Sequence, residues 1–161
     1  IVLDADAINI LSTHRNWLSR LPKRCILTPH LGELERLIGK CMDTYERLTK
    51  VKELAAYLQS YIIVKGAWTT IVAPEGNFYF NPTGNPGMAT GGSGDVLTGI
   101  LLGLLAQGYT REEACRLGVY IHGLAGDIAA EAKTEIGMTA HDIVEALPVA
   151  WKKITSISPK I

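Results

Sequence analysis

The chain has 161 residues, of which 47% are hydrophobic and 20% are charged. This composition is typical of a globular protein and excludes an intrinsically disordered one. Sixteen acidic residues balance sixteen basic ones, so there is no net positive field to attract nucleic acid or an anionic membrane. We therefore expect neither partner, and a single domain over residues 1–161.

The three cysteines, Cys25, Cys41 and Cys115, are widely spaced and form no CxxC pair. This pattern argues against a zinc site or a disulfide framework and predicts a cytoplasmic location. The sequence contains neither a signal-peptide pattern nor an apolar stretch long enough to span a membrane. Because the chain opens directly on a strand-like run at Ile1, we expect it to be the later part of a longer protein.

Two short apolar runs, "IVLDAD" at residues 1–6 and "CILTPH" at 25–30, are each followed by a helical pattern. This alternation predicts two strand–helix units. An amphipathic helix is predicted over residues 43–58, because Asp43 and Glu46 have the spacing of a capping box and the apolar residues recur at helical spacing.

The run "YIIVKG" at residues 61–66 is rich in β-branched residues and is typical of a buried parallel strand. Residues 69–81 predict a hairpin that turns at residues 74–77. The rest of the chain reads as helical after a glycine-rich loop. Capping boxes begin helices at Thr110 and Thr139, and Pro148 is expected to bend or restart the last one.

The glycine-rich loop is "GNPGMATGGSGDVLTGI" (residues 84–100), which holds six glycines and runs into a helical pattern. Such a loop gives bare backbone N–H groups and the positive end of a helix dipole, which together bind anions such as phosphate. The loop has neither the P-loop nor the Rossmann spacing. Asp95, in the first helical turn, is a candidate base for a hydroxyl that attacks phosphorus; alternatively, it only complements the helix N-terminus above a tight turn.

The segment "PGMATGGSGDVLTG" resembles the anion hole and catalytic aspartate of the ribokinase-like superfamily, and within it the ADP- or ATP-dependent NAD(P)H-hydrate dehydratases. Three further stretches resemble that family in the same order: "LDADAIN" (residues 3–9), "TPHLGE" (28–33) and "VKGAWT" (64–69). The resemblance implies a three-layer α/β/α fold with a mainly parallel central sheet, present here as the later part of the domain.

The resemblance implies roles at the nucleotide. Asp95 would be the catalytic base, beside an anion hole formed by Gly92, Ser93 and Gly94. The residues that match the nucleotide segment are Lys65, Gly66, Ala67, Trp68 and Thr69. Without the resemblance, simpler interpretations stay open for two of these residues. Lys65 could be a solvated residue at the end of a strand, and Thr69 could only continue the hairpin.

The resemblance also implies a set of substrate-binding residues, which are Asp6, Asn9, His30, Glu33 and Asp95. Simpler interpretations stay open for four of them. Asp6 could be an acidic loop residue without a function, and Asn9 could only cap a helix. His30 could solvate a turn, and Glu33 could only satisfy a helix dipole. His122, His141 and Trp151 belong to no motif and are expected to be packing or surface residues.

The implied reaction is repair of NAD(P)H hydrate, in which a nucleotide phosphorylates the ring hydroxyl and elimination of phosphate restores NAD(P)H. ADP or ATP would be the co-substrate and Mg²⁺ would bridge its phosphates, with no residue assigned as a metal ligand. A homo-oligomer is expected, and an epimerase domain is possible in the full-length protein. The alternatives are a ribokinase-like kinase for a small alcohol, such as a sugar or hydroxymethylpyrimidine, and an inactive nucleotide-binding fragment.

Overall fold

The computed structural model describes residues 1–156 and is built around a five-stranded sheet. Its strands lie side by side in chain order: β1 (Val2–Leu3), β2 (Ile26–Leu27), β3 (Tyr61–Val64), β4 (Thr70–Val72) and β5 (Phe78–Phe80). The pairs β1–β2 and β2–β3 are parallel, whereas β4 is antiparallel to both β3 and β5. Four strands therefore point the same way and only β4 is reversed, as a mainly parallel sheet with a hairpin requires.

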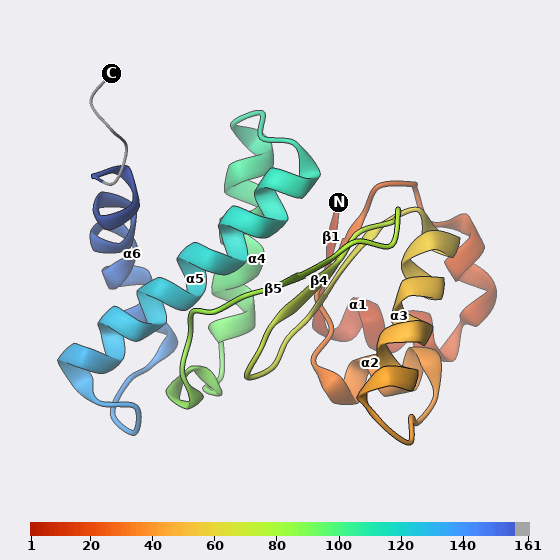
Figure 1. Cartoon of the computed structure of the whole chain (residues 1–161), viewed down its shortest axis with the longest axis horizontal. Helices are drawn as coiled ribbons and strands as arrows, with labels where there is room; N and C mark the ends of the chain where they lie inside the picture. Colours follow the sequence, from red (N-terminus) through yellow and green to blue (C-terminus); the bar gives the residue numbers. More distant parts are fainter. Residues whose placement is uncertain (157–161) are drawn as a thin grey trace.

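Helices cover both faces of the sheet, which gives the predicted α/β/α layering (Figure 1). On one face lie α1 (Ala5–Thr13), α2 (Leu31–Ile38) and α3 (Thr44–Leu58); on the other lie α4 (Ser93–Ala106) and α5 (Arg111–Lys133). The last helix, α6 (Ala140–Thr155), packs on α5 and α4, farther from the sheet. Two short 3-10 helices span Arg15–Arg20 and Pro86–Met88.

Strand β3 is the centre of the core and all four of its residues are buried. Ile62 and Val64 belong to the apolar cluster under α2 and α3. Tyr61 and Ile63 point to the opposite face, into the cluster with α4 and α5. Burial on both faces explains why this segment is a continuous apolar run without polar alternation.

The predicted capping boxes at Thr110 and Thr139 are confirmed as reciprocal boxes that begin α5 and α6. At the start of α3 only half of the predicted box forms: Asp43 accepts a hydrogen bond from the Glu46 N–H at 2.8 Å, whereas the Glu46 carboxylate accepts from the Met42 N–H at 2.7 Å. The predicted hairpin is confirmed as the β4–β5 pair. Pro148 lies inside α6, so the last helix continues past the proline and does not restart there.

The first predicted strand is shorter than its sequence pattern suggests. The strand ends at Leu3 and α1 begins at Ala5, so that Asp4 is the N-cap residue and Asp6 lies in the first helical turn. The two acids of "LDAD" therefore point to different places, because one precedes the helix and the other has joined it. This difference decides which of them reaches the candidate site.

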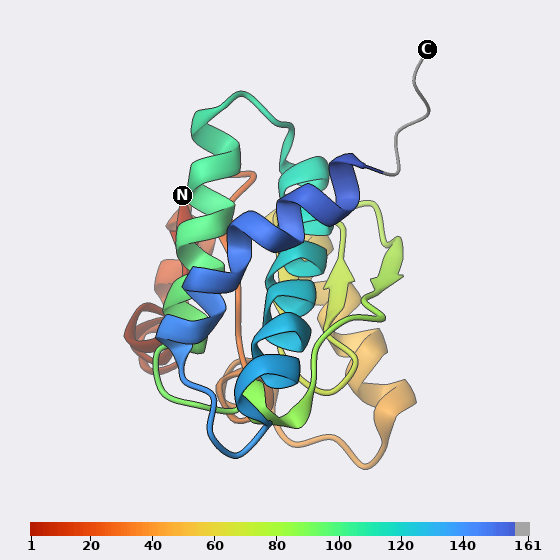
Figure 2. The same cartoon turned by 90° about the vertical axis from the view of Figure 1, so that its left-hand side faces the viewer.

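The segment after β5 runs along α5 (Figure 2). Helix α5 carries Gly123 and Gly126 on the side that meets this segment, where Thr83 and Met88 leave no room for a Cβ atom. Asp127 of α5 also accepts hydrogen bonds from the Gly84 N–H and the Asn85 side chain, both at 3.0 Å. The glycine-rich loop is therefore tied to α5 before it enters α4.

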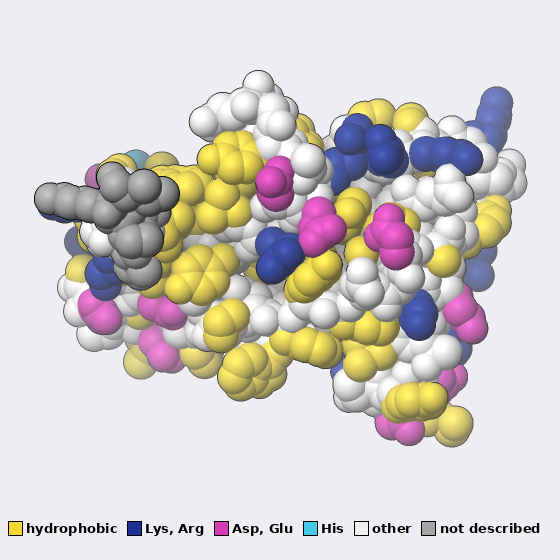
Figure 3. Space-filling model, turned by 45° about the horizontal axis from the view of Figure 1, so that its top comes forward, with side chains coloured by type: hydrophobic (Ala, Val, Ile, Leu, Met, Phe, Trp, Pro, Cys, Tyr) yellow, Lys and Arg dark blue, Asp and Glu magenta, His cyan; other side chains and the backbone are white. Residues whose placement is uncertain are grey.

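The surface view shows hydrophobic side chains gathered mainly over the half of the molecule that carries α4, α5 and α6 (Figure 3). Lys and Arg side chains gather on the opposite half, over the N-terminal helices. Within residues 1–156, none of the helices combines the length and the apolar character that a membrane crossing requires.

Candidate active site

A cavity of about 570 Å³ lies where the end of β3, the segment after β5 and the first turn of α4 meet α5. Seven of the predicted site residues line it: His30, Lys65, Gly66, Ala67, Thr69, Ser93 and Gly94. They come from three motifs that are widely separated in the sequence. The structure therefore brings the predicted phosphate cradle and the predicted nucleotide segment to the wall of one cavity.

Parallel pairing explains why His30 and Lys65 meet. Strands β2 and β3 run in the same direction, so their carboxyl ends emerge at one edge of the sheet, where open α/β sheets place their ligand sites. The ladder extends past both strands as a bridge between His30 and Lys65, and the Lys65 N–H donates to the Pro29 carbonyl at 2.8 Å. The two residues are thus fixed side by side through the backbone.

The N-terminus of α4 reaches the wall of this cavity with Ser93 and Gly94. Its N-cap is Gly92, which has φ 88° and no side chain to cap the helix. The first N–H groups of a helix lack intrahelical partners, and the helix dipole makes this end favourable for an anion. Gly92 is the residue of the cradle that needs the left-handed conformation, while Gly94 provides space at the cavity wall.

An ion pair lies against this helix end. Lys65 Nζ is 2.7 Å from Asp4 Oδ1, and the other Asp4 oxygen accepts from Thr98 Oγ1 at 3.3 Å. Burial alone would raise the pKa of Asp4, but the hydrogen bond and charge of Lys65 outweigh it, so the pKa lies below its usual value. Asp4 is therefore ionised at neutral pH and forms an ion pair with Lys65.

The cavity also contains a histidine that sequence reasoning left as a packing residue. His122 of α5 lines the wall, and its Nε2 lies 3.4 Å from the Ser93 hydroxyl. Burial lowers the pKa of His122 to about 4, and the nearby positive charge of Lys65 acts in the same direction. The imidazole is therefore neutral at pH 7. No motif surrounds it, so only its position in the fold reveals it.

We expect His122 to destabilise the fold in mild acid. Its pKa falls from 6.5 to about 4 on folding, so below pH 6.5 the unfolded chain takes up a proton that the folded protein does not. Stability is then fully present above pH 6.5 and is lost as the pH falls towards 4; by pH 5 the loss is about 2 kcal/mol. Urea unfolding at pH 7.5 and pH 5 measures it. Between these two pH values, His122→Gln should lose about 2 kcal/mol less stability than the wild type. Equal losses in the two proteins would contradict a lowered pKa of His122.

Three of the residues expected at the nucleotide do not line the cavity: Gly92, Trp68 and Asp95. Trp68 is 69% exposed at the tip between β3 and β4. Asp95 is also exposed, because consecutive residues of a helix are about 100° apart and Gly94 already faces the wall. The predicted roles of Trp68 and Asp95 stay predictions.

Besides Asp95, three of the residues expected at the substrate are outside the cavity wall. Asp6 is exposed on α1, and the Asn9 side-chain oxygen accepts from Arg36 at 2.8 Å. Glu33 is buried and closes a capping box, in which its carboxylate accepts from the His30 N–H at 2.8 Å. This hydrogen bond supports the simpler interpretation of Glu33 as a helix-capping acid. The capping box also holds the His30 ring beside the cavity.

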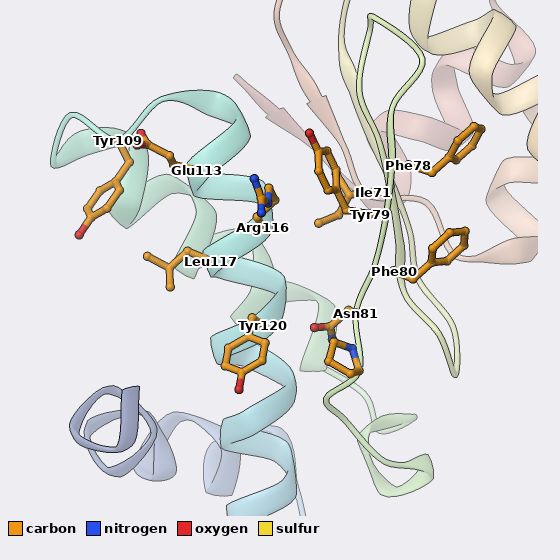
Figure 4. A pocket seen from close by; sticks show the side chains of 11 residues that line it. Ile71, Phe78, Tyr79, Phe80, Asn81, Tyr109, Glu113, Arg116, Leu117 and Tyr120 are labelled. Atoms are coloured by element: carbon orange, nitrogen blue, oxygen red, sulfur yellow. The ribbon is translucent and has the colours of Figure 1, made fainter. Parts of the chain in front are cut away.

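A second hollow, of about 730 Å³, lies between β5 and α5 (Figure 4). Tyr79 points from β5 towards Arg116, whose guanidinium lies 4.6 Å from the centre of the tyrosine ring, while Phe78 and Phe80 point away from α5. The Tyr79 hydroxyl donates to Glu112 at 2.8 Å. None of the sequence-predicted site residues lines this hollow, so we place the candidate active site in the smaller cavity.

The magnesium ion that the family resemblance implies would need few ligands from the protein. Among residues 1–156, no group of three or more His, Cys, Asp or Glu side chains could hold a metal ion. Mg²⁺ commonly keeps several waters and is bound by phosphates with one or two carboxylates. The residues present therefore suit an ion that arrives with the phosphates.

The sequence profile described as NAD(P)H-hydrate dehydratase (Carb_kinase) matches residues 1–149. The chain belongs to this family. The match covers all four motifs, the ion pair and the first turns of α6. Membership therefore rests on the same part of the chain that forms the cavity.

Two relatives indicate how this family member compares with longer proteins. The chain is 42% identical over 161 residues to the ADP-dependent (S)-NAD(P)H-hydrate dehydratase of Neisseria meningitidis, which covers 96% of this chain and 54% of that protein. It is also 42% identical over 156 residues to the bifunctional NAD(P)H-hydrate repair enzyme Nnr of Thermofilum pendens, covering 96% of this chain and 30% of that protein. The family member spans at most about half of each relative.

Solved structures confirm the fold. The ADP/ATP-dependent NAD(P)H-hydrate dehydratase of Bacillus subtilis, co-crystallized with ATP/Mg²⁺, superposes with a TM-score of 0.78 at 36% identity, over 94% of this chain and 54% of that one. A ribokinase-like superfamily protein from Enterococcus faecalis has the same TM-score at 37% identity, over 94% and 52%. This family member therefore has the predicted ribokinase-like α/β fold.

Proposed function

We propose that this chain forms the nucleotide-binding and catalytic part of an ADP- or ATP-dependent NAD(P)H-hydrate dehydratase. The observation that carries the proposal is the convergence of His30, Lys65 and the α4 N-terminus on one cavity. Backbone donors and a lysine together bind phosphate. The proposal is supported by family membership and by relatives with that activity.

In the proposed reaction, the hydroxyl oxygen on the damaged nicotinamide ring attacks the terminal phosphorus of the nucleotide. Asp95 takes the hydroxyl proton, and the N–H groups at the start of α4 stabilise the charge on the transferred phosphoryl group. Elimination then breaks the ring C–O bond, releases phosphate and a ring proton, and restores NAD(P)H. ADP leaves as AMP, or ATP as ADP. Mg²⁺, when bound with the phosphates, neutralises part of their charge.

The reaction is tested by supplying hydrated NADH or NADPH with ADP or ATP and Mg²⁺. Dehydration is expected to appear as growth of the absorbance band of reduced nicotinamide. In parallel, a panel of sugars and hydroxymethylpyrimidine reports the kinase alternative through nucleotide turnover. Turnover of an alcohol without dehydration would replace our proposal by the kinase, and nucleotide binding without either reaction would favour a binding fragment.

Nucleotide binding makes a separate prediction for stability. A ligand that binds only the folded protein adds RT ln(1 + [L]/Kd) to its stability, about 2.7 kcal/mol at 100 times the Kd. For a chain of this size we expect the melting temperature to rise by roughly 5–10 °C with millimolar ADP and Mg²⁺. The shift should shrink in Lys65→Ala and Gly94→Val. A folded wild-type protein that shows no shift would place the nucleotide elsewhere.

The remaining expectations accompany this proposal as predictions. A homo-oligomer, a cytoplasmic location and an epimerase domain elsewhere in the full-length protein are each testable on the native gene product. Size-exclusion chromatography would test the homo-oligomer, and intact mass would test the epimerase domain. Cell fractionation would test the cytoplasmic location.

A further inference from the structure

The Asp4–Lys65 ion pair joins elements that the sequence keeps far apart. Asp4 follows β1, Lys65 follows β3, and Thr98, which donates to Asp4 at 3.3 Å, lies in the second turn of α4. Only 11% of the Asp4 side chain and 22% of the Lys65 side chain are exposed. Both charges are thus mostly removed from water, which requires each to have a partner.

The pair is also directed at the phosphate cradle. A Cβ atom on Gly94 would lie 3.2 Å from Asp4 Oδ2 and 3.2 Å from Lys65 Nζ. The absence of a side chain at Gly94 therefore lets a carboxylate and an ammonium both approach the first turn of α4. Lys65 lines the cavity and Asp4 does not, so the lysine stands between the acid and the space for a ligand.

Two opposing effects follow for a phosphate that enters the cavity. The ammonium attracts it, and the carboxylate behind the ammonium repels it. The carboxylate also restrains the Lys65 side chain, which otherwise rotates about several bonds. With both residues present, the lysine is ordered before the ligand arrives.

We propose that Asp4 is a positioning residue that acts through Lys65: it is the counter-ion that holds the ammonium at the α4 N-terminus for a nucleotide phosphate. The inference rests on the proposed function, because it takes a nucleoside diphosphate as the ligand. Asp4, and not Asp6, is then the acid of the "LDADAIN" segment that contributes to the nucleotide site.

The test is a double-mutant cycle read by ADP affinity, measured by calorimetry on the folded proteins at fixed Mg²⁺. Lys65→Met is expected to weaken ADP binding on the order of 10- to 100-fold, because a cation is lost and Asp4 is left as a bare like charge. Adding Asp4→Asn should restore roughly tenfold of that loss. Glu46→Gln, which breaks the 2.8 Å ion pair with Lys50 on α3, is the control and should not change the affinity of either background.

A second measurement reads the ion pair without a nucleotide. Trace acetylation of Lys65, quantified by peptide mass spectrometry, should be roughly threefold faster or more in Asp4→Asn, because the hydrogen bond that holds the Lys65 nitrogen against the carboxylate is lost. Each measurement is made at a temperature where unfolding is negligible in all variants.

The outcomes separate the two proposals. Restored affinity in the double variant together with faster acetylation supports the positioning role. If the double variant binds ADP no better than Lys65→Met, or if acetylation is unchanged, the role of Asp4 is overturned. If wild-type protein binds no ADP while acetylation still accelerates, the nucleotide function fails but the restraint of Lys65 by Asp4 stands.

Discussion

Replacement of Asp95 by Asn is expected to lower the turnover of NAD(P)H hydrate by about 10²–10⁴-fold, which is the usual loss when a general base is removed. The amide keeps the size of the side chain but cannot accept the hydroxyl proton at neutral pH. ADP affinity should change by only a few-fold, because Asp95 is outside the cavity wall. Initial rates at saturating ADP, with calorimetry of ADP binding, measure the two effects separately.

The matched control for this prediction is Asp142→Asn, which removes an acid from the first turn of a different helix, α6. It should leave turnover near the wild-type value. Asp95 is exposed, so Asp95→Asn should keep the fold. In Asp142→Asn the amide oxygen can still accept the hydrogen bond from the Thr139 N–H, so this variant should keep the fold as well. If Asp95→Asn retained near-normal turnover, the base would have to be another residue, and the exposed position of Asp95 would be explained by its favourable interaction with the helix dipole alone.

Gly123→Val is expected to have the largest effect on stability. A Cβ at this position would lie 2.7 Å from the Thr83 carbonyl carbon and 2.8 Å from its oxygen, and backbone atoms cannot rotate away as a side chain can. The contact would push the segment after β5 off α5 and break the 2.9 Å hydrogen bond from the Thr83 hydroxyl to the Tyr120 carbonyl. We expect a loss of about 3 kcal/mol and a melting temperature lower by roughly 6–12 °C.

Gly99→Ala provides the comparison within a neighbouring helix. Gly99 lies in α4, where an added Cβ would meet nothing within 4 Å. Alanine is the better helix former by about 0.5–1 kcal/mol, so this variant should melt at the same temperature or higher. Equal melting temperatures for Gly123→Val and wild type would show that the loop does not need its close approach to α5. Because Thr83, Gly84 and Gly123 line the cavity, the destabilised variant should also lose the ADP-dependent shift.

Local signals in the sequence were sufficient for most of the elements. Capping boxes located the starts of α5 and α6, and the β-branched run located β3, because hydrogen bonds within one turn and burial on both faces leave a direct mark on residue choice. The start of α1 was less certain from sequence. The pattern "IVLDAD" reads equally as a longer strand, and the helix begins at Ala5 with φ 45°, a conformation that no composition rule predicts.

The sequence by itself determined the family, the order of strands and helices, and the two segments, at Lys65 and at Ser93, that line the cavity. These properties depend on neighbours in the chain, so short motifs encode them. Only the tertiary structure decided that Asp4 and not Asp6 meets Lys65, that His122 stands beside Ser93, and that Asp127 holds the loop. The partners in these contacts are 29 to 61 residues apart. Their distances are fixed by parallel strand pairing and by the close packing of α5, which no local spacing in the sequence records.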